Sequence, residues 1–293
     1  MQDTMQRIRF GPAGNSDSFY AAGYTATWQA PKWLSEMGLQ AFEYSLGHGI
    51  RIREDTAATI KKAAQEYDIQ MSVHFPYYIN LVTTDPENIQ KNKEYFLKAV
   101  TVSRQMGAVR GIFHPGSAGK TGRPDSLSAA CALLKEIIQT LDEAGLGLDT
   151  FALCPETMGK LSQLGDLEEM LALCNVDERL LPCIDFGHLH CRGMGAIQSQ
   201  DDYTAILDAT ENRVGLARAK QLHIHFSRIE FTKAGEKMHH TFADTQFGPE
   251  FPPLAELLYK RRYTPVVICE SRGTMAEDAL TMQKMYGAWA QST

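Results

Sequence analysis

The sequence lacks any apolar run long enough to cross a bilayer, and its first ten residues, MQDTMQRIRF, lack the apolar segment of a secretory signal. We therefore expect a cytoplasmic protein with no membrane contact. Its six cysteines show no closely spaced pairs, which argues against a disulfide framework and against an all-cysteine zinc site. The net charge of −6 excludes a chain coated with positive charge for nucleic acid, but it is compatible with a local basic patch.

A nucleotide-binding phosphate loop is also missing. The segment GSAGKTG at 116–122 resembles one, but the pattern GxxxxGK[ST] requires glycine where His114 stands. A nucleotide triphosphatase is therefore excluded. The chain also has no linker-like stretch, no low-complexity tract and no sequence repeat, so a single domain spanning 1–293 is the simplest organisation.

What the sequence does contain is a regular alternation of short apolar runs and amphipathic segments of helical length. Strands are predicted at 8–10, 41–44, 69–74, 109–114, 151–156, 181–185, 221–226 and 265–270. Helices are predicted to begin near positions 30, 55, 88, 126, 166, 201, 249 and 274. Strands separated by helices pair in parallel, and eight such units favour an α/β fold of the (β/α)8 TIM-barrel type over an open, doubly wound sheet.

Side chains of metal-ligand type recur at or just past the carboxyl ends of these strands. They are His74, His114, Glu156, Asp185, His223 and Glu270. In a closed parallel barrel these ends open onto one face, so the six groups are expected to converge. Bound divalent cations would offset the cost of gathering them, and mixed imidazole and carboxylate donors suit zinc, manganese or iron.

Further histidines lie close to this predicted site. His188 follows Asp185 with DxxH spacing, and His239 or His240 can reach the site from the loop after the seventh strand. His190 and His225 are weaker candidates, because each lies two residues beyond a histidine that we consider better placed. They are expected to support a ligand, although His225 and His240 stay open as ligands themselves.

The loops on the same face carry many cations, which suggests an anionic substrate such as phosphate. The basic residues are Arg51, Arg53, Lys120, Arg123, Arg192, Arg228, Lys233, Lys237 and Arg272. Solvated surface charge is the plain alternative. Tyr77, beside His74, is placed to stack on a base or sugar, or simply to pack.

The motifs VHFPYYINL, FHPGS, CPET, CIDFGH, LHIHFS, MHHTF and ICES occur in this order over about two thirds of the chain. In this the sequence resembles the endonuclease IV family, zinc-dependent xylose-isomerase-like barrels that act at abasic sites in DNA. The resemblance implies one zinc held by His74, His114 and Glu156, and a second held by Glu156, Asp185, His223 and Glu270. A third would be held by His188 and His239, and Tyr77 would lie near the DNA.

Two features depart from this family. The family's third zinc takes an aspartate two residues before the final histidine, where this chain has Lys237, so the third ion would either be absent or be held with help from Glu236 or Asp244. The loop at 44–52 also lacks the arginine-bearing segment with which the family enters the minor groove. Both features bear more on abasic-site specificity than on the metals.

The resulting hypothesis is a DNA-repair enzyme that cleaves phosphodiesters with two or three zinc ions and needs no protein partner. Glu156 and Glu270 would be its catalytic residues, because they fix the metals, and Tyr77, Lys237, Arg228 and Arg272 would contact the DNA. The main alternative is a sugar or sugar-phosphate isomerase or epimerase with one manganese or magnesium, in which Glu156 and Glu270 act as acid and base. A metal- or nucleic-acid-binding protein without activity is a third possibility, suggested by Lys237.

Overall fold

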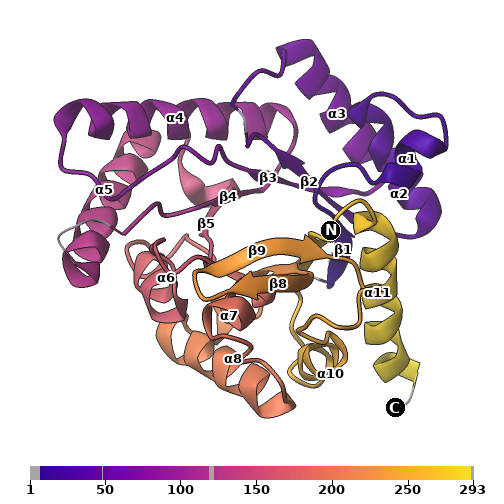
Figure 1. Ribbon diagram of the computed structural model, residues 1–293. Coiled ribbons are helices and arrows are strands. Elements are labelled where there is room, and N and C mark those ends of the chain that lie inside the picture. Colours follow the sequence, from indigo (N-terminus) through magenta and orange to yellow (C-terminus); the bar gives the residue numbers. More distant parts are fainter. Residues whose placement is uncertain (1–6, 48, 119–121, 292–293) are drawn as a thin grey trace.

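Eight parallel strands form two four-stranded sheets in this computed structural model, which describes residues 7–47, 49–118 and 122–291 (Figure 1). One sheet has the order β1 (Arg9–Pro12), β10 (Val266–Cys269), β7 (His223–Phe226), β6 (Cys183–Asp185), and the other β2 (Ala41–Ser45), β3 (Gln70–His74), β4 (Arg110–Phe113), β5 (Ala152–Pro155). Parallel bridges from Ala13 to Glu43 and from Glu156 to Cys183 join the sheets at both edges. The strands therefore close into the predicted (β/α)8 barrel.

Helices follow the strands and cover the outside of the barrel (Figure 1). The eight predicted helices are α2 (Ala30–Met37), α3 (Glu54–Glu66), α4 (Pro86–Gln105), α5 (Arg123–Glu143), α6 (Leu167–Cys174), α8 (Gln200–Val214), α10 (Pro252–Lys260) and α11 (Met275–Gln291). Local chemistry sets several starts: Asp85 accepts a hydrogen bond from the Asn88 N–H, and Asp166 accepts one from the Glu169 N–H. No helix in the described ranges is long and apolar enough to cross a membrane.

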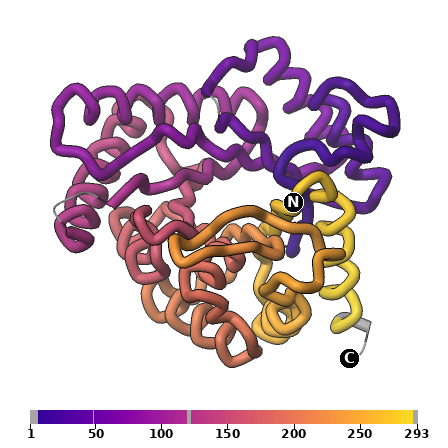
Figure 2. The backbone as a smooth tube through the Cα atoms, in the orientation of Figure 1, coloured from indigo at the N-terminus to yellow at the C-terminus, as the bar shows by residue number. Residues whose placement is uncertain are grey.

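Several elements were not predicted. They are the helices α1 (Asp17–Ala21), α7 (Phe186–Arg192) and α9 (Leu216–Ala219), the 3-10 turns η1 (Thr27–Gln29) and η2 (Leu148–Thr150), and an antiparallel hairpin of β8 (Arg228–Thr232) and β9 (Gly235–His240). The hairpin packs against α7, and in Figure 2 its orange tube lies in front of the barrel strands. Helix α7 carries His188 and the hairpin carries His239, so both elements bear on the site.

The inside of the barrel is unusually polar. The large apolar core lies between the strands and the helices and includes Phe42, Val73 and Leu153. Residues two apart on a strand face the same side, so the inward positions include buried Glu43, Ser72, Arg110, Cys183 and His223. Barrels of this kind are ordinarily filled there by branched aliphatic side chains. This polar layer lies directly beneath the carboxyl-end mouth.

Candidate metal centre

Six ionisable side chains meet at the carboxyl ends of six neighbouring strands. His74, His114, Glu156, Asp185 and Glu270 are each the last residue of a strand or the next one, and His225 lies one residue before the end of β7. Above them is a cavity of about 680 Å³ whose lining includes His74, His114, Glu156, His188, Glu236, His239 and Glu270. The predicted convergence on one mouth is thus present in the fold.

The first group of possible ligands consists of His74, His114 and Glu156. The Nε2 atoms of both imidazoles lie 3.1 Å from the same carboxylate oxygen, Glu156 Oε2. On the other side of its ring, His74 Nδ1 lies 3.0 Å from the carbonyl oxygen of Phe75. A proton on Nδ1 would satisfy that carbonyl, which leaves the Nε2 lone pair directed toward the Glu156 carboxylate.

The second group consists of Glu156, Asp185, His225 and Glu270, whose ligand atoms lie within 4.8 Å of one another. His225 Nδ1 is 3.0 Å from Glu156 Oε1 and 3.3 Å from Glu270 Oε1. Glu156 belongs to both groups, since its Oε2 faces the first and its Oε1 the second. The carboxylate is therefore placed as a bridge between two neighbouring ion positions.

The third group consists of His188, Glu236 and His239. Glu236 lies between the two imidazoles, 3.5 Å from His188 Nε2 and 3.7 Å from His239 Nε2. His188 Nδ1 lies 2.9 Å from the carbonyl oxygen of Thr157, and His239 Nδ1 lies 2.7 Å from Ser227 Oγ. Both rings are thus held from behind, with their Nε2 atoms toward the shared carboxylate.

A buried oxygen without a hydrogen bond supports the fit of these residues to a cation. Asp185 Oδ1 accepts a hydrogen bond from the His188 N–H (2.7 Å), whereas the buried Oδ2 has no hydrogen-bond partner within the described part of the chain. Oδ2 has an ion-pair contact with His188 Nδ1 at 3.4 Å. A buried carboxylate oxygen without a hydrogen bond is costly, and a divalent cation would reduce that cost. Imidazole and carboxylate donors suit zinc or manganese, so the donor set agrees with the predicted type of metal.

The crowding of charges shifts the pKa values of the site. Burial would lower the pKa of His188, but the charges of Asp185 and Glu156 outweigh it and raise that pKa to about 9. Burial raises the pKa of Glu270; His225 opposes this shift, and Asp185 and Glu156 reinforce it. Carboxyls and imidazoles held this close compete for protons, as they do at many functional sites.

His223 was predicted to be a metal ligand, but it lies deeper in the barrel than the other predicted ligands, one layer of side chains further from the mouth. On β6 and β7 the partner of Asp185 is His225, and the partner of His223 is Cys183. His223 Nε2 accordingly lies 3.0 Å from Glu43, and His225 takes the predicted place beside Glu156 and Glu270. The predicted strand 221–226 already contained the signal, because only His225 lies close to its carboxyl end.

A carboxylate next to Lys237 lies between the two histidines of the third group. Lys237 forms an ion pair with Glu230 at 2.5 Å, while Glu236 supplies the carboxylate between His188 and His239. Asp244, the other residue considered for this role, accepts hydrogen bonds from the Thr241 N–H and hydroxyl. His240 lies 3.2 Å from Glu230, outside the third group, and His190 Nδ1 lies 3.0 Å from the Ile197 carbonyl oxygen.

The rim of the cavity carries a smaller set of side chains than predicted. Tyr77 is 54% exposed, and its ring centroid lies 5.4 Å from those of His74 and His114. Lys160, Lys237 and Arg272 also line the cavity, and Arg272 Nη1 lies 3.0 Å from Met238 Sδ. An exposed aromatic ring and three cations thus surround the mouth.

Other predicted basic residues have structural roles instead. Arg228, predicted to bind substrate, is buried and donates hydrogen bonds to the Phe247 carbonyl and to Glu250, because it opens β8 on the inner side of the hairpin. Arg123 pairs with Glu169, and Arg192 donates to the carbonyl oxygens of Met158 and Lys160. Lys120 lies outside the described residues.

Fold and site together define a (β/α)8 barrel with clustered metal-type ligands at its carboxyl-end mouth. A family model described as xylose isomerase-like TIM barrel matches residues 31–285, and the chain belongs to that family. An uncharacterized protein of Methanocaldococcus jannaschii is 32% identical over 253 residues, which cover 86% of this chain and 89% of that protein.

Relatives of known name extend the comparison. A probable endonuclease 4 of Staphylococcus carnosus is 29% identical over 175 residues, covering 58% of this chain and 56% of that protein. The alignment thus spans about half of that relative. Endonuclease IV from Thermus thermophilus superposes with a TM-score of 0.67 at 18% identity, covering 97% of this chain and 100% of that one. A D-tagatose 3-epimerase-like protein has a TM-score of 0.71 at 15% identity, covering 97% and 98%. The predicted resemblance to endonuclease IV is confirmed, while the two structures show the fold alone.

Proposed function

We propose that the protein is a metal-dependent hydrolase that cleaves phosphodiester bonds of DNA at abasic or damaged sites. The observation that carries the proposal is the set of three ligand groups around one cavity, two of them sharing Glu156. The sequence match to proteins named probable endonuclease 4 points to the same reaction class.

The proposal assigns a role to each group. His74, His114 and Glu156 would hold one ion, and Glu156, Asp185, His225 and Glu270 a second. His188, Glu236 and His239 would hold a third. Bound zinc ions would act as Lewis acids on phosphoryl oxygens and make a water-derived nucleophile available near neutral pH.

The chain's own residues would orient the DNA above these ions. Tyr77 offers an exposed ring at the mouth, on which a base or sugar of a distorted site can stack. Arg272, Lys237 and Lys160 surround the cavity, where they can pair with backbone phosphates. Such contacts fix register without reading sequence, as expected of an enzyme that recognises damage.

A sugar or sugar-phosphate isomerase or epimerase is the second candidate. Its support is that Glu156, Asp185, His225 and Glu270 form a complete four-residue site for a single ion, in a fold shared with the epimerase-like protein. The group of His188, Glu236 and His239 favours the hydrolase, because a reaction that uses a single ion would not require these additional ligands. The third possibility, an inactive binding protein, was based on the lysine at position 237. Glu236 offers a carboxylate near His188, so this lysine is a weaker reason to expect an inactive protein.

Incision of a duplex containing an abasic site tests the proposal directly. Zinc-loaded protein should cut this duplex, and Glu156→Gln should abolish cutting, because the substitution removes a ligand shared by two groups. Glu211→Gln, on α8 with Tyr263 and Arg261 as partners, is the matched control and should cut normally. Intact duplex with zinc-loaded wild-type protein, together with turnover of a sugar phosphate, would establish the second candidate instead.

A further inference from the structure

A buried glutamate lies beneath the metal-type ligands and belongs to none of their groups. Glu43 is on β2 and is 1% exposed. Its Oε2 accepts a hydrogen bond from Ser72 Oγ at 2.8 Å and lies 3.0 Å from His223 Nε2, and its Oε1 lies 3.0 Å from His225 Nε2. A charged group inside a closed barrel is costly unless it is paired. The role of Glu43 can therefore be inferred from the side chains that pair with it.

His225 connects Glu43 to the candidate metal site. Its Nδ1 faces Glu156 and Glu270, and its Nε2 faces Glu43 Oε1. Within the described residues, neither Nε2 nor Oε1 makes a hydrogen bond in favourable geometry, and the two atoms lie 3.0 Å apart as an ion pair, so each is the buried group available to the other. A neutral imidazole carries one proton and one lone pair, and a carboxylate at one nitrogen keeps the proton there.

We propose that Glu43 is a positioning residue that holds the proton of His225 on Nε2 and thereby directs the Nδ1 lone pair to the ion shared with Glu156, Asp185 and Glu270. The proposal rests on the proposed function only in that this second group binds a metal. It also gives His223 a role, because this histidine and Ser72 occupy the other oxygen of Glu43 and fix the carboxylate in place.

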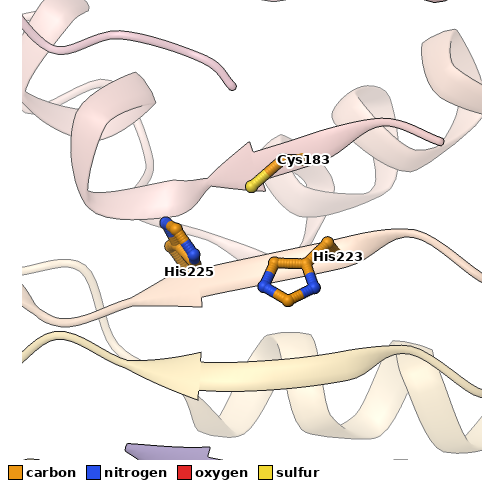
Figure 3. A group of neighbouring side chains, drawn as sticks. All are labelled: Cys183, His223 and His225. Atoms are coloured by element: carbon orange, nitrogen blue, oxygen red, sulfur yellow. The ribbon is translucent and has the colours of Figure 1, made fainter. Parts of the chain in front are cut away.

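A second explanation of the polar layer would be a further ion between Cys183, His223 and His225, which come from the adjacent strands β6 and β7 (Figure 3). The contacts disfavour it. His223 already faces Glu43 with Nε2, and its Nδ1 lies 3.5 Å from Arg110 Nη1. Burial also raises the pKa of the Cys183 thiol. A cation there would lie close to the Arg110 guanidinium and would have to displace the thiol proton.

Metal affinity of Glu43→Gln tests the proposal without measuring DNA cleavage. Glutamine has one acceptor oxygen, so it cannot accept from both His223 and His225. In chelator competition we expect one ion per chain to bind about 10- to 100-fold more weakly, with the other ions unchanged. Glu211→Gln is the control for replacing a carboxylate by an amide and should bind all ions as wild type does. Wild-type affinities in Glu43→Gln would overturn the proposal.

Two further measurements keep the test decisive if Glu43→Gln does not fold. In cadmium-loaded wild-type protein with isotope-labelled histidine, the metal should couple to Nδ1 of His225, and coupling to Nε2 would overturn the proposal. Cys183→Ser should keep every ion, whereas loss of one would place a metal in the polar layer instead. A protein that gives the expected results but does not cut DNA would refute the proposed function and leave this role of Glu43 intact.

Discussion

At the scale of single residues, two positions along one strand separate a ligand from a supporting side chain. His223 and His225 both point into the barrel, but the register of β6 against β7 aligns only His225 with Asp185. His223 is level with Cys183 and Glu43, one layer further from the mouth. The chemistry of a histidine in this fold is therefore set by its depth along the strand.

This difference predicts opposite outcomes for the same substitution. His225→Ala should lose one bound ion per chain and lower the proposed phosphodiesterase activity by more than about 100-fold, since removing a ligand costs more than removing a supporting residue. His223→Ala should keep the ion count and instead lower the free energy of unfolding by about 1–3 kcal/mol, because Glu43 loses a buried partner. Elemental analysis after dialysis and denaturant unfolding measure the two effects. Loss of an ion in His223→Ala alone would contradict the assignment.

The residues that sequence reasoning located, and those it missed, differ in a physical way. His74, His114, Glu156, Asp185 and Glu270 follow apolar runs directly, so the strand pattern alone places them at the mouth. Glu43 lies inside the run AFEYS, where a charge is detectable, but its histidine partners come from β7, about 180 positions away. These partners meet only when the barrel closes in its particular strand register. No local sequence pattern indicates that register.

At the scale of elements, the β8–β9 hairpin supplies most of the third ligand group. Glu236 and His239 are both on β9, which a bulge between Glu230 and Phe231 shifts relative to β8. That bulge explains why counting back two residues from His239 leads to Lys237 rather than to the inward carboxylate. The strand was not predicted, because its residues GEKMHH lack the apolar alternation of a core strand.

Gly235 fixes where this hairpin lies. Its φ is +99°, and a Cβ there would collide with the carbonyl oxygen of Gly159. We expect Gly235→Ala to push β9 away from the loop after β5 and to weaken metal binding at the proposed site of His188, Glu236 and His239. The ions at His74–His114 and at His225 should stay. Stepwise metal titration separates these sites, and uniform weakening of all ions would contradict the local effect.

The start of α6 makes a separate prediction about acid stability. Glu169 is buried, accepts hydrogen bonds from the Gly165 and Asp166 N–H groups and pairs with Arg123. Burial would raise its pKa, but these contacts outweigh burial and lower it. Its stabilisation is therefore present above the unfolded-state pKa of about 4.3 and is lost as the pH falls through the lower folded-state value.

Glu169→Gln should accordingly lower the free energy of unfolding by about 1.5–3 kcal/mol at pH 7, the usual contribution of hydrogen bonds to a charged group. The difference from wild type should shrink steadily as the pH drops below about 4. Denaturant unfolding at a series of pH values measures both. A difference that stays constant into strong acid would show that packing, and not the charge, stabilises this helix start.

At the scale of the whole molecule, an acidic chain places three cations around the mouth of the candidate metal centre. The net charge is −6, yet Lys160, Lys237 and Arg272 line the cavity above the ligand groups. The overall fold was predictable because eight strand and helix units leave few topologies, and closure then forces all strand ends to one side. The sequence does not reveal which loop cations reach the mouth. Arg123, Arg192 and Arg228 instead bind backbone carbonyls and acidic side chains.

This distribution of charge predicts weak, salt-dependent binding of DNA through few contacts. Three phosphate contacts correspond to a slope of about −2.7 in a plot of log affinity against log salt concentration. Lys160→Ala should reduce the steepness by about 0.9 and weaken binding similarly for all sequences. Fluorescence anisotropy with an abasic duplex, using Glu156→Gln to prevent cutting, measures the slope. A salt-independent affinity would contradict phosphate contacts at this mouth and would favour a small neutral sugar as the substrate.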